Sequence, residues 1–398
     1  MRVMMYAPGI GLGHVRRCYN IAREVLKREP GASVIIVTDS QAAHTYAAVT
    51  GLDYLKLPSV TKIKRTIWIP NTIGLDIDQL VTLRSNILLA AFRTFAPDAV
   101  LVDHRPVGVY GELKPLLTEA AQRSPRVRLY LGLRDILDDP DVMWGLWDSM
   151  QARDCLGLYE AALIYGQPDF YDLASAMGMA GAVRDVVWNG YVAPPLNGDG
   201  PAGAQKPMVL MTGGAGADAF PVAEAFVGAL PRILGATDLE AVIVTGPQMP
   251  LERQDQLRSM LPSGRVRIES NVEDATRLVR RASVIVSMAG YNSQIEALRW
   301  GKRTLVVPRF GPSNEQRMRA RIFGERNLIR VIEPEELSSE RVAEGVLQLL
   351  QDDSVPDTSS MPRLDGAERA AEVLLSGHTE HRSHVSRDLA LAVPEEGV

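Results

Sequence analysis

Residues 287–298 read Ser287-Met-Ala-Gly-Tyr-Asn-Ser-Gln-Ile-Glu-Ala-Leu298, and this is the most specific stretch of the chain. It joins the end of a short apolar strand to an amphipathic helix through a tight turn at Gly290. The first amides of a helix have no partner within it, and they attract an anion. We therefore expect Tyr291, Asn292 and Ser293 to point their amides at an anionic ligand above the strand.

The same succession of apolar strand, loop and amphipathic helix repeats along the chain, which is the pattern of parallel β-α-β units. In the first half, strands are predicted at Val3–Ala7, Val34–Thr38, Ala99–Val102, Val127–Leu131, Ala162–Tyr165 and Val186–Trp188. In the second half, they are predicted at Met208–Thr212, Ala241–Thr245, Val266–Ile268, Val284–Ser287, Thr304–Val307 and Leu328–Val331. The sequence thus predicts an α/β fold of two Rossmann-like, doubly wound domains facing a cleft, where ligands bind at the carboxyl ends of the strands.

Domain boundaries follow from the same pattern, and the chain is long enough for two cores. Residues 1–192 form the predicted first domain, 193–206 a Pro/Gly-rich linker, and 207–352 the second domain. Residues 353–376 form a loop and a last helix, and 377–398 an acidic tail that we expect to be disordered. The tail holds His378, His381 and His384, whose spacing suits a metal on a helix, although a solvated tail is the simpler interpretation.

Composition and charge exclude several classes of protein. The hydrophobic fraction of 46% is ordinary for an α/β protein, and no run reaches the ~18 apolar residues of a membrane span, so we expect a cytoplasmic protein. Of the charged residues, 352–398 hold ten acids and four arginines, which leaves 39 basic and 38 acidic residues elsewhere. This nearly neutral body argues against nucleic-acid binding. Cys18 and Cys155 imply neither a disulfide framework nor a zinc site.

The first strand ends in the glycine-rich segment Ala7-Pro-Gly-Ile-Gly-Leu-Gly-His14, followed by a predicted helix over Val15–Lys27. Its glycines permit a tight turn and a close approach to a ligand, as in a dinucleotide site. A plain dinucleotide site gives His14 no role. His14 is either a solvent-facing neighbour of the helix cap or a functional group, since its unperturbed pKa suits proton transfer near neutral pH.

The second domain opens with a similar loop, Thr212-Gly-Gly-Ala-Gly-Ala-Asp218, in which Asp218 is a predicted helix N-cap. Further along, Ser293-x-x-Glu296 has the form of a capping box, so spacing alone leaves Glu296 open to a cap or a ligand contact.

A polar loop, Pro308-Arg-Phe-Gly-Pro-Ser-Asn-Glu-Gln316, precedes another predicted helix. Ser313 or Asn314 would cap that helix. Glu315 and Gln316 are able to hydrogen-bond sugar hydroxyls.

Together these segments resemble the GT-B glycosyltransferases, in particular the branch containing the peptidoglycan lipid-intermediate N-acetylglucosaminyltransferase and its "predicted glycosyltransferase" relatives. The resemblance covers about residues 1–350 and rests on Gly11-Leu-Gly-His14, Gly213-Gly-Ala-Gly216, and Ser287–Glu296 with Asn314-Glu-Gln316. It implies that Glu296 holds the ribose hydroxyls of the donor. It also places Glu315-Gln316 where the family has a Gln-Gln pair that reads the donor sugar, a departure that leaves the sugar undefined.

Three further segments, residues 98–108, 132–137 and 165–168, look like the predicted-glycosyltransferase relatives. The acceptor therefore need not be a cell-wall lipid.

The resemblance implies transfer of a sugar, with inversion, from a nucleotide diphosphate donor, preferably a UDP-sugar, to a hydroxyl or amine of a small-molecule or lipid-linked acceptor. His14 is the candidate base and Asp103 the residue that orients it; Gly11, Gly13 and Arg134 are expected on the acceptor side of the cleft. The predicted donor site comprises Gly213, Gly214, Gly216, Val272, Ala289, Gly290, Tyr291, Asn292, Ser293, Glu296, Arg309, Glu315 and Gln316.

We expect no metal and no cofactor, because helix N-termini at Gly213–Gly216 and Gly290–Ser293, with Arg309, would stabilise the diphosphate. Asp76-Ile-Asp78 matches the metal-binding pair of GT-A enzymes, but it opens a predicted helix over Asp78–Phe95 instead of ending a strand.

Two functional alternatives are a nucleotide-sugar 2-epimerase or hydrolase and a non-catalytic nucleotide-sugar-binding protein. The basic and aromatic loop of Lys62, Lys64, Arg65 and Trp68 is either solvated or a contact for an anionic or lipid acceptor, so peripheral membrane contact stays open.

Overall fold

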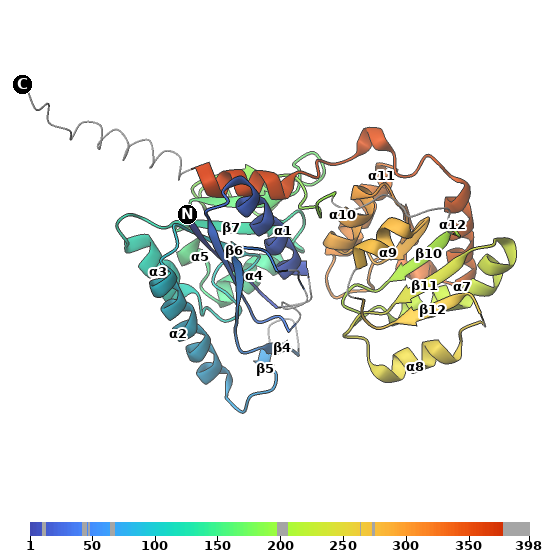
Figure 1. The fold of residues 1–398 in the computed structure, drawn as a ribbon, viewed down its shortest axis with the longest axis horizontal. Coiled ribbons are helices and arrows are strands. Elements are labelled where there is room, and N and C mark those ends of the chain that lie inside the picture. Colours follow the sequence, from blue (N-terminus) through green and yellow to red (C-terminus); the bar gives the residue numbers. More distant parts are fainter. Residues whose placement is uncertain are drawn as a thin grey trace, which may run out of the picture.

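The computed structural model describes residues 1–9, 13–41, 46, 48–63, 68–196, 206–262, 264–272 and 275–376. These residues form two parallel sheets, one in each half of the chain, with helices packed around them (Figure 1). Gly11, Lys64, Arg65, most of the predicted linker and the predicted tail lie outside the described residues.

The first sheet has seven strands in the order β3-β2-β1-β6-β7-β8-β9. Its strands are β1 (Arg2–Ala7), β2 (Ser33–Thr38), β3 (Leu52–Lys56), β6 (Ala99–Asp103), β7 (Arg128–Arg134), β8 (Ala161–Tyr165) and β9 (Val186–Trp188). The helices are α1 (Gly13–Arg28), α2 (Ile77–Phe95), α3 (Lys114–Gln122), α4 (Pro140–Ser149), α5 (Arg153–Leu156) and α6 (Leu173–Ala176). A separate antiparallel hairpin consists of β4 (Val60–Lys62) and β5 (Trp68–Pro70).

The second sheet has six strands in the order β12-β11-β10-β13-β14-β15. Its strands are β10 (Met208–Thr212), β11 (Glu240–Val244), β12 (Val266–Glu269), β13 (Val284–Ser287), β14 (Arg303–Val306) and β15 (Arg330–Val331). The helices are α7 (Phe220–Ala236), α8 (Leu251–Ser259), α9 (Ala275–Arg281), α10 (Tyr291–Arg299), α11 (Glu315–Glu325) and α12 (Ser339–Gln351), with 3₁₀ turns at Pro334–Glu336 and Thr358–Ser360.

The apolar strands are buried on both faces, as expected for parallel sheets covered by helices. In β1, Val3 and Met5 belong to the core beneath α1, whereas Met4 and Tyr6 belong to the core on the opposite face. This alternation confirms the predicted α/β fold. The predicted strands are present in both halves with small shifts at their ends, whereas β3 and the β4-β5 hairpin were not predicted. In β3, the exposed charged residues Asp53 and Lys56 interrupt the half-buried ones, which hides the strand in a search for apolar runs.

The last helix, residues 366–376, returns to the first domain (Figure 1). Its apolar side chains, including Ala370 and Leu374, join the core beneath α1. Arg28 of α1 also pairs with Glu372 at 3.0 Å. The chain thus crosses between the two halves twice.

Both sheets reverse their strand order beside a central strand, β1 in the first and β10 in the second. At such a switch point, the loops that follow adjacent strands diverge and leave a crevice for ligands. The loop after β1 leads to His14, and β6 ends at Asp103. In the described part of the chain, no helix has the length and apolarity required to cross a membrane.

Candidate active site

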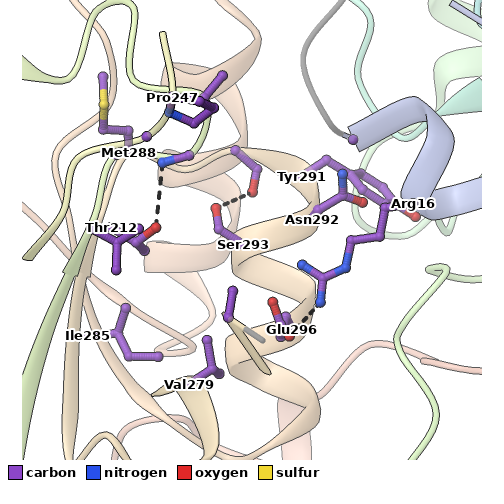
Figure 2. Close-up of a pocket in the computed structure, with 18 of the residues that line it drawn as sticks. Arg16, Thr212, Pro247, Val279, Ile285, Met288, Tyr291, Asn292, Ser293 and Glu296 are labelled. Carbon is purple, nitrogen blue, oxygen red and sulfur yellow. Dashed lines mark hydrogen bonds and ion pairs between the residues drawn. The ribbon is translucent and has the colours of Figure 1, made fainter. Parts of the chain in front are cut away.

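A cavity of about 330 Å³ lies between the two halves and is lined by both (Figure 2). This volume is within the range of small-molecule sites. The first domain contributes Gly13, His14, Arg16, Arg17 and Arg134, and the second contributes the loops that follow β10 and β13.

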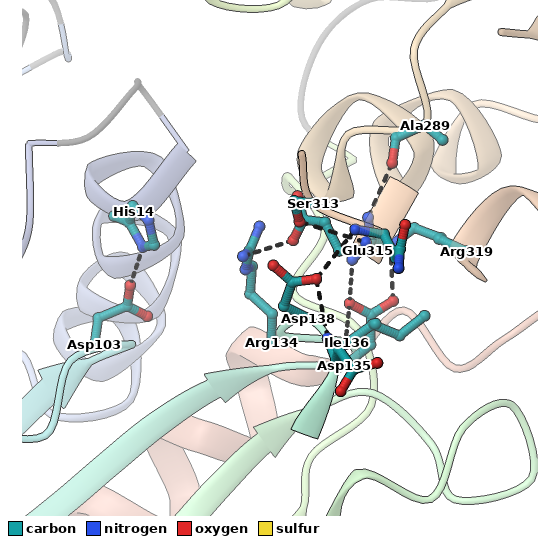
Figure 3. Close-up of polar contacts among 12 residues, drawn as sticks. His14, Asp103, Arg134, Asp135, Ile136, Asp138, Ala289, Ser313, Glu315 and Arg319 are labelled. Atoms are coloured by element: carbon teal, nitrogen blue, oxygen red, sulfur yellow. Dashed lines mark hydrogen bonds and ion pairs between the residues drawn. The ribbon is translucent and has the colours of Figure 1, made fainter. Parts of the chain in front are cut away.

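His14 lies in the first turn of α1, and its side chain is buried against the end of β6 (Figure 3). Its Nδ1 is 2.5 Å from Oδ2 of Asp103, a carboxylate with no exposed surface. Burial raises the pKa of Asp103, but Arg17 and His14 outweigh burial and hold that pKa below its usual value. The ionised carboxylate only accepts hydrogen bonds, so Nδ1 carries the proton and Nε2 keeps its lone pair.

The pKa of His14 is lowered, chiefly because burial disfavours the charged imidazolium. Asp103 opposes this shift, whereas the positive charges of Arg17 and Arg134 reinforce it. The imidazole is therefore neutral near pH 7, the state in which it accepts a proton. The interpretation of His14 as a solvent-facing neighbour of the cap is wrong, because its ring is packed against the ring of His104 at 5.0 Å.

Arg17 holds the same carboxylate from the next turn of the helix. Its Nε and Nη2 donate to the two oxygens of Asp103 at 2.9 and 2.7 Å. Its guanidinium also lies 5.4 Å from the ring centres of Tyr165 and Tyr291. Asp103 is therefore fixed from two sides, by a cation and by the imidazole that it orients.

The sequence interpretation missed both Arg16 and Arg17. Consecutive arginines near the first turn of a helix oppose its dipole, so they were an available sign that this end of α1 serves another purpose. Arg16 reaches across the cavity to Glu296 of α10, with 2.6 Å between Nη2 and Oε1 (Figure 2).

Helix α10 begins directly at the cavity, with Gly290 as its N-cap. Two expectations are wrong here. Ala289, not Gly290, has the left-handed backbone (φ 57°) that makes the turn. Ser293 lies inside the helix and donates to the carbonyl of Gly290, so Ser293-x-x-Glu296 is not a capping box. Glu296 instead accepts from Arg16 and from Thr276.

The glycine-rich loop after β10 differs from the prediction. The following helix, α7, starts only at Phe220 with Ala219 as N-cap, so Gly213–Gly216 is not a helix N-terminus and Asp218 is not a cap. Added Cβ atoms on Gly213 and Gly216 would lie 2.6 and 2.4 Å from the Thr245 carbonyl oxygen, so packing explains these glycines. Gly214 differs from these two glycines. Its backbone is left-handed (φ 63°), an added Cβ would meet no atom within 4 Å, and the residue lines the cavity.

Asp218 is a cavity residue that was missed. Its carboxylate pairs with Nε of Arg309 at 3.3 Å. Arg309 therefore already has an anionic partner, and a phosphate would have to share or displace it.

Two ion pairs join the end of β7 to helix α11 (Figure 3). In one pair the arginine comes from β7, and in the other it comes from α11. Arg134 contacts Glu315 at 2.6 Å, and the adjacent Asp135 is held by Arg319, one helical turn further along α11. Burial raises the pKa of Glu315, but Arg134 and other arginines outweigh burial and keep that pKa low, so Glu315 is ionised. An anionic side chain and a cation from the other domain therefore meet where the donor sugar is expected.

Gln316 has a structural contact of its own. Its Oε1 accepts a hydrogen bond from the amide of Arg309 at 3.1 Å. Asn314, one of the two predicted capping residues, is the N-cap of α11, but its side chain makes no capping hydrogen bond. The hydroxyl of Ser313 instead accepts from the amide of Glu315 at 3.5 Å.

Most predicted site residues line one cavity. These are Gly13, His14, Arg134, Gly213, Gly214, Val272, Gly290, Tyr291, Asn292, Ser293, Glu296, Arg309, Glu315 and Gln316. Gly216, Ala289 and Asp103 do not line the cavity, and Gly11 is outside the described residues.

Asp76 is the N-cap of α2, where its side chain and that of Gln79 form a reciprocal capping box. Asp78 lies in the first turn of the same helix and does not end a strand. Within the described ranges, no group of three or more His, Cys, Asp or Glu side chains is placed to hold a metal ion.

Parts of this chain are similar in sequence to known glycosyltransferases. Residues 208–374 match the model of the glycosyltransferase family 28 C-terminal domain. The UDP-N-acetylglucosamine--N-acetylmuramyl-(pentapeptide) pyrophosphoryl-undecaprenol N-acetylglucosamine transferase of Leuconostoc mesenteroides is 24% identical over 317 residues, which cover 77% of this chain and 78% of the relative.

Two solved structures are similar over nearly their whole lengths. The glycosyltransferase of kitacinnamycin has a TM-score of 0.64 at 18% identity, with 94% of this chain and 98% of that chain covered. A UDP-glucose: anthocyanidin 3-O-glucosyltransferase in complex with UDP has a TM-score of 0.58 at 14% identity, with 94% of each chain covered.

The facing Rossmann-like domains and these similarities define the class: the chain is a glycosyltransferase with the GT-B fold. Within that class it is related to the branch that contains the peptidoglycan N-acetylglucosaminyltransferases, as the sequence resemblance indicated.

Proposed function

We propose that the protein transfers a sugar from a UDP-sugar to an acceptor hydroxyl or amine, with inversion at the anomeric carbon. The observation that carries this proposal is the cavity between the domains, which has a neutral, oriented imidazole on one wall and an anion-attracting helix end on the other. The choice of UDP is supported by a relative that is named for a UDP-sugar and by a protein of similar fold that was solved with UDP.

The diphosphate would be held without a metal by helix ends and cations. The first turns of α1 and α10 both line the cavity, and each helix N-terminus carries roughly half a positive charge. Arg134 and Arg309 line the same walls, each paired with a carboxylate that a phosphate would have to share or displace. These fixed dipoles and charges would stabilise the leaving diphosphate as its negative charge increases.

His14 would act as the base. As the acceptor oxygen or nitrogen forms its bond to the anomeric carbon, the bond from that carbon to the diphosphate oxygen breaks, and the acceptor proton moves to Nε2. The positive charge that then develops on the imidazole is stabilised by Asp103, which already accepts from Nδ1. Arg17 keeps Asp103 in place throughout.

The proposal is tested first by a thermal-shift screen against UDP, GDP, ADP and dTDP. A ligand of the native state at 100 times its Kd adds about 2.7 kcal/mol of stability, so UDP should raise the melting temperature most. Equal shifts with all four would contradict a uridine site, and no shift would contradict the donor site itself.

Analysis of the products then distinguishes sugar transfer from hydrolysis and from epimerisation. Incubation with a panel of UDP-sugars and candidate acceptors should yield a glycosylated acceptor and UDP. Release of free sugar alone, or a change at C2 of the sugar, would identify a hydrolase or a 2-epimerase. Metal independence and a cytoplasmic location stay predictions of this proposal.

A further inference from the structure

Arg16 is a first-domain residue that reaches into the donor half of the cavity (Figure 2). We propose that Arg16 is a positioning residue for the donor, one that fixes Glu296 so that its carboxylate selects a ribose over a deoxyribose. This inference rests on the proposed UDP-sugar donor and adds a residue from the opposite domain to it.

Glu296, Arg16 and Thr276 contact one another pairwise, and both partners of Glu296 bind the same carboxylate oxygen. Oε1 accepts from Nη2 of Arg16 at 2.6 Å and from Oγ1 of Thr276 at 2.6 Å, and the same Nη2 is 3.1 Å from Oγ1 of Thr276. An ionised carboxylate offers about four acceptor sites. The contacts from Arg16 and Thr276 occupy two of them, both on Oε1.

The other oxygen, Oε2, has no hydrogen-bond partner among the residues that the structure describes. Its two acceptor sites equal the number of hydroxyl donors in a ribose 2′,3′-diol. A 2′-deoxyribose would leave one of these sites unfilled, and an unpaired acceptor on a buried charged group is costly. Glu296 is only 3% exposed before any ligand binds, and a bound nucleotide would cover the rest, so little room would be left for water at the unfilled site.

The geometry depends on both partners of Oε1. Glutamate has three side-chain torsions, and without its ion pair the carboxylate would rotate among them. Two partners on Oε1 fix the plane of the group and leave Oε2 facing the cavity. Thr276 comes from the donor domain itself, whereas Arg16 comes from α1, so the first domain completes a recognition element of the second.

Close packing holds α1 in this position. A Cβ on Gly13 would lie 2.4 Å from Nδ2 of Asn292, so the start of α1 touches the start of α10 directly. Arg16 is two residues from His14, and the same helix therefore carries both the candidate base and the residue that orients the ribose contact.

The test compares the affinities for UDP and for 2′-deoxy-UDP by calorimetric titration of the full-length protein. The variants are Arg16→Met, Arg16→Lys and, as a matched control, Arg28→Met. Arg28 lies at the far end of the same helix in an exposed pair with Glu372. Wild type should prefer UDP by about tenfold or more, the effect of one hydrogen bond to a charged group.

Arg16→Met should reduce UDP affinity and bring the preference close to one, because the carboxylate is no longer oriented. Arg16→Lys should restore part of the preference, and Arg28→Met should leave it unchanged. Equal weakening of both nucleotides by Arg16→Met would overturn the inference, since it would show general attraction of the diphosphate or a packing role.

The same titrations distinguish a failure of the proposed UDP donor from a failure of the proposed role of Arg16. A wild-type protein that binds neither nucleotide overturns the UDP donor, and the role of Arg16 with it. A wild type that discriminates, together with an Arg16→Met variant that discriminates equally, overturns the role of Arg16 alone.

Discussion

Arg319 provides a test of how the two domains are held around the cavity. It has no exposed surface and donates to both oxygens of Asp135 at 2.7 and 2.9 Å, and Nη1 donates to the carbonyl of Ala289 at 2.9 Å. Asp135 belongs to the first domain and Ala289 to the donor turn of the second. One guanidinium thus joins the two domains and supports the left-handed residue before α10.

Replacement by methionine keeps most of the side-chain volume but leaves the Asp135 carboxylate without its cation. Asp135 is 1% exposed and retains a hydrogen bond from the amide of Ile136. Breaking a buried pair in this way costs about 3–5 kcal/mol. We expect Arg319→Met to lower the free energy of unfolding by that amount, and to weaken UDP binding because the donor turn loses a contact.

The measurement is urea denaturation followed by circular dichroism, with Arg321→Met as the matched control. Arg321 lies on the same helix with 73% of its side chain exposed and a 3.7 Å pair to Glu325, and such surface pairs contribute about 0–1 kcal/mol. Adding Asp135→Asn to Arg319→Met removes the unpaired charge and should recover part of the loss. Equal stabilities of the Arg319→Met and Arg321→Met proteins would refute the reasoning.

Three further predictions concern the site. Glu296→Ala should weaken UDP binding by about 1–3 kcal/mol in calorimetric titration; unchanged affinity would remove Glu296 from the donor site. Transfer activity should survive excess EDTA, and Asp76→Asn with Asp78→Asn should leave kcat nearly unchanged, because Asn caps a helix about as well as Asp and neither side chain is expected to hold a metal; activity that EDTA abolishes and manganese restores would contradict the diphosphate site. The pH profile of kcat/KM, which reports the free enzyme, should fall on the acid side with an apparent pKa below the usual 6.5 of histidine, because burial lowers the pKa of His14 and a protonated imidazole accepts no proton; an acid limb well above 6.5 would point to another base.

The sequence predicted the two sheets because parallel strands buried on both faces form continuous apolar runs, such as the five buried residues of β6. It also predicted most of the cavity, since the loops after β1, β10 and β13 carry glycines and polar residues at strand ends. The half-exposed strand β3 was missed because its polar residues interrupt the apolar pattern.

Contacts between the domains could not be predicted from local spacing. The pairs Arg16–Glu296 and Arg134–Glu315 join residues more than 180 positions apart, and periodicity within a segment carries no information on them. The capping box at Ser293 was wrong for a related reason. Helix α10 starts three residues earlier than the box requires, with Gly290 and not Ser293 as its N-cap, because the turn is made by Ala289 and held by Arg319 from a distant helix.

The central claim is that His14 removes the acceptor proton while the second domain holds the donor. The most direct measurement is the turnover of His14→Ala at saturating UDP-sugar and acceptor, together with its affinity for UDP. We predict that kcat falls by about 10²–10⁴-fold, the range for loss of general acid–base catalysis, and that UDP affinity is nearly unchanged. A wild-type kcat, or a large loss of UDP affinity with little effect on saturated turnover, would contradict the claim.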